Sequence, residues 1–247
     1  MTDCPNLPRS CEKCGLINAP EGPRYVTLFS YAEGTTDMDE EQAFMLGKAL
    51  AELHIVSGNF NTNLDRYELD ASELLDNSIT RLKEFLGPEW EVELSQLELL
   101  ANDSKEKIVA IEKTAGTYGV IGGDVHGYNQ HFTSNNQLTM FDFEFCAYGY
   151  HVYDIATFRW SRGSDDEALW TAFLNGYQSV RKLTNTELEA IDAFVVARHL
   201  WWMQFLTDLK EYQYHFNKEF WGGAFGRLLN KPKNKRPVLS KNRGIFN

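Results

Sequence analysis

Long apolar runs are missing from this sequence of 247 residues. No run reaches the roughly 18 residues that a membrane-spanning helix requires. The first residues, Met1–Pro5, also lack the basic and apolar regions of a secretory signal peptide. We therefore expect a cytoplasmic protein that has no membrane partner.

Basic residues are scarce as well. The chain has 24 Lys and Arg against 35 Asp and Glu, and its net charge is -11. Proteins that bind nucleic acids usually present a basic face to the phosphate backbone. The charge balance therefore argues against a nucleic-acid partner, and it disfavours docking on an anionic lipid surface for the same reason.

The four cysteines do not make a complete metal site. They are Cys4, Cys11, Cys14 and Cys146. Cys11 and Cys14 form a lone Cys-x-x-Cys pair, whereas a structural zinc ion needs about four ligands. No second pair follows at a suitable spacing. We expect reduced thiols in a polar leader rather than a zinc site.

The chain does contain enough apolar residues for a sizeable core, since 43% of it is hydrophobic. Residues 1–23 show no periodicity and are expected to be irregular. The β-branched and aromatic run over 24–31 predicts a strand. Thr36 and Asp37 can cap a helix that ends near His54.

Most of the remaining chain shows apolar residues at helical spacing. Helices are expected after Ser72 and over residues 93–113, 153–162, 165–182, 186–208 and 212–229. Short strands are expected at 120–121, 131–133 and 138–141, with a turn at 134–137 and a loop around 148–150. This pattern predicts an α+β fold that is mainly α and carries a small β hairpin.

The residues that point to chemistry lie around the short strands. Asp124 is followed five residues later by Asn129, and Asp142 comes after the next turn. A carboxylate can orient a hydroxyl group and accept its proton, and carboxylate and amide oxygens are ligands that Mg²⁺ prefers. Asp142 lies between Phe141 and Phe143, where burial without a cation or donors would be costly. These groups together favour phosphoryl transfer from ATP.

The motifs resemble one family in particular. Gly122-Gly-Asp-Val-His-Gly-Tyr-Asn129 and Phe141-Asp-Phe-Glu144 are similar to the His-Gly-Asp-Leu-His-x-x-Asn and Ile-Asp-Phe-Glu motifs of aminoglycoside phosphotransferases and choline kinases. Gly149 to Ala156 resembles the family's Gly-x(4)-Asp-Leu-Ala. Leu28 to Gly34 resembles its interlobe hinge, and the helix ending at His54 resembles the helix that follows. The matching segments occur in the family's order over residues 24–160.

This resemblance implies a protein-kinase-like C-terminal lobe over residues 35–229, preceded by a hinge-like strand at 24–34 and followed by a polar tail at 230–247. It implies an ATP- and Mg²⁺-dependent phosphotransferase that acts on a hydroxyl of a small molecule. Asp124 would be the catalytic base, and Asn129 and Asp142 would bind magnesium. The adenine site would use Phe29, Ser30, Tyr31 and Ala32, and the supporting residues would be His126, Asp154 and Glu144.

The sequence departs from the family in two places. Gly122 stands where the first motif has histidine, which would loosen the loop. Only residues 1–23 precede the hinge-like strand, Lys13 is their only lysine and they contain no glycine-rich loop. We expect an N-terminally truncated lobe, with the first residues as a leader or N-lobe remnant.

This truncation leaves open a catalytically impaired, pseudokinase-like binding protein. A metal-dependent hydrolase is disfavoured because the hinge-like segment has no part in hydrolysis. The acceptor stays open among aminoglycosides, choline, homoserine and sugars.

Overall fold

The computed structural model describes residues 14–28, 30–60, 66–209 and 216–229. The chain divides into two units, residues 1–33 and 34–247. Within the described ranges, no helix has both the length and the apolar character to cross a bilayer.

The first unit contains a β hairpin, which corrects the irregular leader expected over residues 1–23 from residue 14 onward; residues 1–13 lie outside the described residues. Strand β1 (Cys14–Ala19) pairs antiparallel with strand β2 (Gly22–Thr27) through a two-residue turn. Gly22 has a φ of +128°, which a side chain would disfavour, so a glycine at the end of this turn permits the close reversal. The strand expected over 24–31 therefore begins earlier and ends at Thr27.

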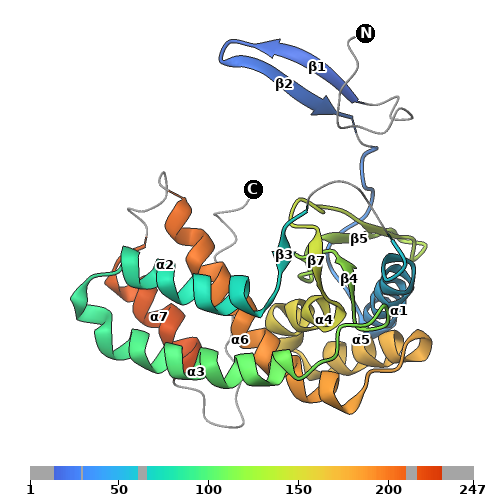
Figure 1. The fold of residues 1–247 in the computed structure, drawn as a ribbon. Coiled ribbons are helices and arrows are strands. Elements are labelled where there is room, and N and C mark those ends of the chain that lie inside the picture. Colours follow the sequence, from blue (N-terminus) through green and yellow to red (C-terminus); the bar gives the residue numbers. More distant parts are fainter. Residues whose placement is uncertain (1–13, 29, 61–65, 210–215, 230–247) are drawn as a thin grey trace. The chain divides into compact units, whose positions relative to one another are not determined.

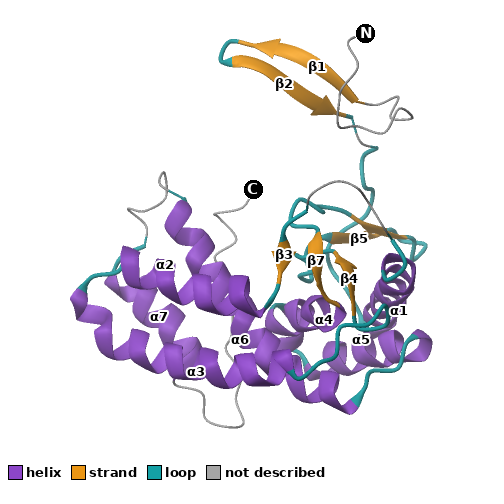
Figure 2. Ribbon diagram, viewed as in Figure 1, coloured by secondary structure: helices purple, strands orange, loops and turns teal. Residues whose placement is uncertain are grey.

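The second unit is mainly helical (Figure 2), as the sequence predicts. Its α-helices are α1 (Glu40–Ser57), α2 (Ser78–Phe85), α3 (Glu91–Val109), α4 (His151–Trp160), α5 (Glu167–Val180), α6 (Asn185–Asp208) and α7 (Lys218–Leu229). Shorter helical turns are the π-helix at Ser72–Asn77 and the 3-10 turns at Pro88–Trp90 and Arg162–Ser164. The helix expected from residue 212 begins at Lys218 in the described range, and residues 212–215 lie outside it.

Two small β structures lie beside these helices. Strands β3 (Glu68–Leu69), β7 (Ala147–Tyr150) and β4 (Tyr118–Ile121) form a sheet in the order β3-β7-β4. β3 runs parallel to β7, and β4 runs antiparallel to it. Strands β5 (Gln130–Phe132) and β6 (Leu138–Met140) form the predicted hairpin.

Strand β7 corrects the loop that was expected around residues 148–150. It is the central strand of its sheet. Its short length and its Gly149 both weaken the sequence pattern that would predict a strand. A Cβ at Gly149 would lie 2.5 Å from Cδ1 of Ile121. The glycine therefore lets the neighbouring strand pack close, a tertiary requirement that local pattern does not reveal.

Helix caps fix the entry of the chain into α1 and α6. Asp39, and not Thr36 or Asp37, caps α1 in a capping box with Gln42. Helix α6 begins with a second capping box, and most of its length is buried. Figure 1 shows α6 beside α2, α3 and α4, which it contacts, while α1 packs against α5. Helix α6 thus packs beside α4, whose residues are all buried.

Candidate active site

The three residues singled out by the motifs come together around one small cavity. Asp124 lies in the loop between β4 and β5, Asn129 directly precedes β5, and Asp142 follows β6. The cavity is lined by all three and by Leu46, Gly122, Val125, Gln130, Met140, Phe141 and Phe143. The β5–β6 hairpin thus brings Asp142 to the same cavity as Asp124 and Asn129. We call residues 122–129 the Asp124 loop.

The carboxylate of Asp124 is held on one side. Its Oδ1 accepts a hydrogen bond from Nη2 of Arg198 on α6. Nδ2 of Asn129 donates to the backbone oxygen of Asp124 at 3.0 Å and lies 3.4 Å from Oδ2. The Asp124 side chain is 11% exposed. Among the described residues, Oδ2 therefore has only the longer contacts.

His126 faces the same oxygen at a longer distance. Its Nε2 lies 3.6 Å from Oδ2 of Asp124, which is too long for a hydrogen bond. The backbone N–H of Tyr128 donates to Nδ1 at 3.2 Å, so the neutral ring carries its proton on Nε2. Burial lowers the pKa of His126 below its ordinary value, although the charge of Asp124 opposes this. A neutral His126 presents an N–H toward Asp124 without neutralising it.

Asp142 differs from the expectation in one respect, because its side chain is exposed. The desolvation argument for a cation at this residue is therefore wrong. Its backbone supplies a different observation: φ is +63°, in the left-handed region that costs a non-glycine residue about 1 kcal/mol or more. Such strained backbone is concentrated at functional sites, where the surrounding structure holds it.

The residues around the cavity fit a magnesium ion. The Asn129 side chain directs its Nδ2 at Asp124, so its Oδ1 points away from Asp124. No hydrogen bond from another described residue reaches the Asp142 carboxylate. Among the described residues no cluster of three His, Cys, Asp or Glu could hold a metal. An Asn and an Asp would leave the other positions to water and phosphate, as is usual for Mg²⁺.

Asp154, on helix α4, holds the start of the Asp124 loop in place. It is fully buried on α4, and its two carboxylate oxygens accept hydrogen bonds from the backbone N–H groups of Gly122, at 2.8 Å, and Gly123, at 2.9 Å. Nε2 of His54 on α1 lies 3.0 Å from Oδ2. Three donors therefore satisfy this buried carboxylate.

The departure at Gly122 has a packing explanation. A Cβ at Gly122 would lie 2.7 Å from Cγ2 of Val125. The Val125 side chain therefore occupies the space that a larger residue would need. The predicted loosening of the loop is not what the contacts indicate, because Asp154 and Val125 hold it closely.

A buried chain of hydrogen bonds continues outward from Asp154. Nδ1 of His54 lies 2.8 Å from the hydroxyl of Tyr177 on α5, which in turn accepts from Nη1 of Arg181 at 3.0 Å. Because the Tyr177 hydroxyl donates to Nδ1, the His54 proton lies on Nε2 and points at Asp154. Helices α1, α4 and α5 are thereby joined to the Asp124 loop.

Two parts of this site were missed by the sequence analysis, namely the His54 chain and Arg198. Arg198 is a single basic residue within the apolar run from Ala193 to Trp202, and only 3% of it is exposed. A charged residue in such a run needs a buried partner of opposite charge. That signal marks Arg198 as unusual but does not identify Asp124 as its partner.

The remaining predicted residues are not tied to the cavity. Glu144 is exposed and makes no hydrogen bond or ion pair with another described residue. Ser30 and Tyr31 are exposed and Ala32 is half-buried, all without regular secondary structure in the first unit. Phe29 lies outside the described residues. Their proposed roles stay predictions.

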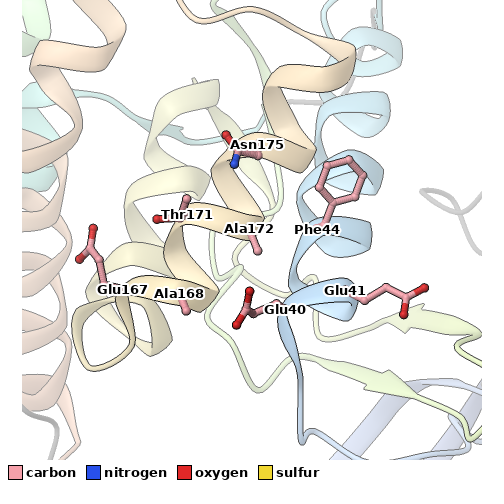
Figure 3. Close-up of a pocket in the computed structure, with 8 residues that line it drawn as sticks. All are labelled: Glu40, Glu41, Phe44, Glu167, Ala168, Thr171, Ala172 and Asn175. Atoms are coloured by element: carbon pink, nitrogen blue, oxygen red, sulfur yellow. The ribbon is translucent and has the colours of Figure 1, made fainter.

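A wider hollow lies on the second unit, away from the Asp124 loop. It has a volume of about 680 Å³ between α1 and α5 (Figure 3). It is lined by Glu40, Glu41, Phe44, Glu167, Ala168, Thr171, Ala172 and Asn175. None of the predicted site residues lines it, so it carries no part of the chemistry argued below.

Comparisons with known proteins agree with the kinase-like interpretation of the fold. The model of a family described as "Phosphotransferase enzyme family" matches residues 9–189. An uncharacterised protein of Synechocystis sp. is 34% identical over 222 residues, which cover 86% of this chain and 60% of that protein. An uncharacterised protein of Deinococcus radiodurans is 32% identical, covering 76% of this chain and 56% of the other. The chain thus spans less than two thirds of the length of these relatives.

Solved structures show a similar fold at low sequence identity. The microcompartment-associated aminopropanol kinase has a TM-score of 0.66 at 19% identity, covering 87% of this chain and 68% of that one. The amicoumacin kinase hAmiN, solved with AMP-PNP, Ca²⁺ and amicoumacin, has a TM-score of 0.64 at 16% identity, covering 90% and 71%. The choline kinase LicA from Streptococcus pneumoniae has a TM-score of 0.60 at 13% identity, covering 87% and 72%. These likenesses confirm the kinase-like fold class.

Proposed function

We propose that this chain, which belongs to the phosphotransferase enzyme family, transfers the γ-phosphoryl group of ATP to a hydroxyl of a small molecule. The observation that supports this most is the placement of Asp124, Asn129 and Asp142 around one cavity. A cytoplasmic location stays a prediction.

Asp124 would act as the proton acceptor. The acceptor hydroxyl oxygen forms a bond to the γ-phosphorus, the bond from that phosphorus to the bridging oxygen of ADP breaks, and the hydroxyl proton passes to Oδ2 of Asp124. Oδ1 is already occupied by Arg198, so the carboxylate has one oxygen for this proton. Because phosphoryl transfer depends mainly on positioning and charge, a fixed carboxylate suits the reaction.

The remaining residues would hold the phosphates and the loop. Oδ1 of Asn129 and the carboxylate of Asp142 would bind Mg²⁺, which supplies positive charge to the phosphate oxygens when bound. Asp154 keeps the N–H groups of Gly122 and Gly123 in place and does not contact the reacting atoms. Ser30 to Ala32 would offer backbone groups to adenine, and Phe29 would line that pocket.

The experiment is a transfer assay with the full chain. Mg²⁺ and ATP labelled at the γ-phosphate are mixed with kanamycin, choline, homoserine or glucose, and the labelled product is measured. Asp124→Asn is expected to lower the rate about 10²- to 10⁴-fold, the usual contribution of a general base. Asp192→Asn, on the exposed face of α6, serves as the matched control and should keep the wild-type rate. An active Asp124→Asn protein would refute the proposed role.

The alternative is a catalytically impaired binding protein of the same fold. One observation favours it: the described residues before Gly34 form a single hairpin and contain no lysine for the ATP phosphates. Binding of Mg²⁺-ATP by calorimetry without transfer to any acceptor or to water would select this alternative. Transfer that depends on Asp124 would exclude it.

A further inference from the structure

Arg198 makes a contact with Asp124 that none of the sequence motifs includes. Besides the bond from Nη2 to Oδ1 of Asp124, its Nη1 lies 3.4 Å from the Tyr153 hydroxyl. Its guanidinium carbon is 5.0 Å from the ring centres of both Trp160 and Trp201. The planar cation thus contacts two indole rings, and its Nη2 is directed at the carboxylate.

The positive charge of Arg198 lies in a buried position. Burial alone would lower the pKa of Arg198, but Tyr153 and Asp124 raise it above its ordinary value, so the side chain stays cationic. Nε of Arg198 is buried without a hydrogen-bond partner in the described part of the chain. A buried ion pair with an unsatisfied donor is a poor source of stability compared with well-packed apolar residues. The contact is better explained by what it does to Asp124.

The other contacts of the Asp124 carboxylate are weak. Asn129 Nδ2 is 3.4 Å and His126 Nε2 is 3.6 Å from Oδ2. The terminal torsion of an aspartate is broad, so neither contact would prevent the carboxylate from rotating. Arg198 is itself fixed by the two tryptophans, and its fork is rigid. It can therefore set the direction of the carboxylate.

We propose that Arg198 is the positioning residue of this site: it binds Oδ1 of Asp124 and leaves Oδ2 directed at the acceptor hydroxyl. The inference rests on the proposed function. Arg198 does not contact the reacting atoms, so its effect should appear in the rate of transfer rather than in the binding of Mg²⁺-ATP or acceptor.

Arg159 provides a matched control on the neighbouring helix α4. It is 2% exposed, its guanidinium carbon is 4.7 Å from the centre of the Trp170 ring, and it is paired with Glu167 at 2.9 Å. Its Nε is also buried without a partner among the described residues. Arg159 therefore matches Arg198 in burial, ring contact and charge, but it donates to Gly163 and Glu167 rather than to Asp124.

The test compares Arg198→Met, Arg198→Lys and Arg159→Met in the transfer assay. The acceptor is the compound of the panel that wild type phosphorylates. If wild type only hydrolyses ATP, the acceptor is water. Arg198→Met should lower kcat about 10²-fold, the loss expected for a misplaced reacting group, while both KM values stay near wild type. Arg198→Lys should recover part of kcat, because an ammonium can still bond one carboxylate oxygen. Arg159→Met should lose stability but keep kcat.

A second measurement does not depend on activity. The shifts of the urea midpoint are compared for Arg198→Met, Asp124→Asn and the double variant. Shifts that do not add confirm that the two side chains interact in the folded protein, and additive shifts overturn the inference.

The remaining outcomes are also decisive. A wild-type kcat in Arg198→Met, an equal loss of kcat in Arg159→Met, or a change confined to KM would each overturn the positioning role. A wild type without any transfer refutes the proposed function and the positioning role with it, even where non-additive shifts confirm the ion pair.

Discussion

The Asp124 loop, which joins β4 to β5, and the hairpin of β1 and β2 are both short segments, but different contacts hold them. The loop donates a hydrogen bond to Asp154 on α4, and it accepts hydrogen bonds from Arg162, which follows α4, and from Arg198 on α6. The hairpin is held by its own strand pairs and by an exposed Arg24–Glu21 ion pair. An isolated two-stranded hairpin is only marginally stable in water. The contacts described for the loop therefore come from helices distant in sequence, and those described for the hairpin join its own strands.

The largest effect is expected from Asp154→Ala. Three donors, on Gly122, Gly123 and His54, would lose their acceptor in a buried place. We expect the free energy of unfolding to fall by about 3 kcal/mol or more, measured by urea denaturation. Asp192→Ala, at an exposed site on α6, should change it by less than about 0.5 kcal/mol. A small effect of Asp154→Ala would show that the loop does not depend on its buried support.

Replacing one glycine by alanine in the Asp124 loop and one in the hairpin tests the contrast between these two segments with the same chemical change. At Gly127 a Cβ would lie 1.9 Å from Cγ of Arg162, whereas at Gly15 in β1 nothing lies within 4 Å. Gly127→Ala should displace Arg162, whose Nε donates to the Gly127 oxygen at 3.0 Å and whose Nη2 donates to the Thr36 oxygen at 2.8 Å. We expect a loss of about 2 kcal/mol in the free energy of unfolding.

Gly15→Ala is expected to change stability by less than about 0.5 kcal/mol. Equal effects at Gly127 and Gly15 would contradict the contrast between the loop and the hairpin. The measurement is urea denaturation of both variants beside wild type.

Burial around the loop should also give a pH dependence. His151 stacks on His54, and its pKa is lowered from 6.5 to about 3 by burial, with smaller contributions from His54 and Arg181. Its Nδ1 donates to the Gly116 oxygen, while Nε2 is buried without a partner in the described residues. Below pH 6.5 the unfolded chain binds a proton that the folded chain excludes, so stability is full above this pH and falls toward pH 3.

At pH 5.5 the expected loss from His151 is about 1.4 kcal/mol relative to neutral pH. Urea denaturation at pH 7.5 and 5.5 should show a smaller pH effect in His151→Asn than in wild type. An unchanged pH effect in that variant would place the pH dependence on other groups.

The sequence predicted three residues that line one cavity, but it did not predict the contacts that support them. The spacing of Asp124, Asn129 and Asp142 is local, so the motifs placed these residues beside the predicted β5–β6 hairpin. The partner of Asp124 lies 74 residues away in the sequence, and the partner of Asp154 lies 100 residues away. Helical spacing shows which face is buried, but it does not show which buried residues meet.

Most of the wrong predictions also concern features that local sequence spacing does not encode. Asp142 was expected to be buried from its aromatic neighbours, but it is exposed in a left-handed turn that spacing does not encode. Strand β7 was missed because its pairing with β3 and β4 is tertiary. The β1–β2 hairpin was partly missed although it is local, because no alternation marks β1.

The smallest effect is expected in the hairpin, from Arg24→Met. Nε of Arg24 lies 2.5 Å from Oε1 of Glu21, but the two side chains are 63% and 54% exposed. An exposed ion pair contributes less than about 1 kcal/mol, because water already solvates both charges. Hydrogen exchange of the β1 and β2 amides should therefore be nearly the same in this variant and in wild type, since strand pairing sets their protection. The buried counterpart is Arg181→Met, which leaves Glu187 without its cation at a fully buried position and should speed exchange around α6. A large effect of Arg24→Met on the hairpin amides would mean that side-chain charge, rather than backbone pairing, holds this unit.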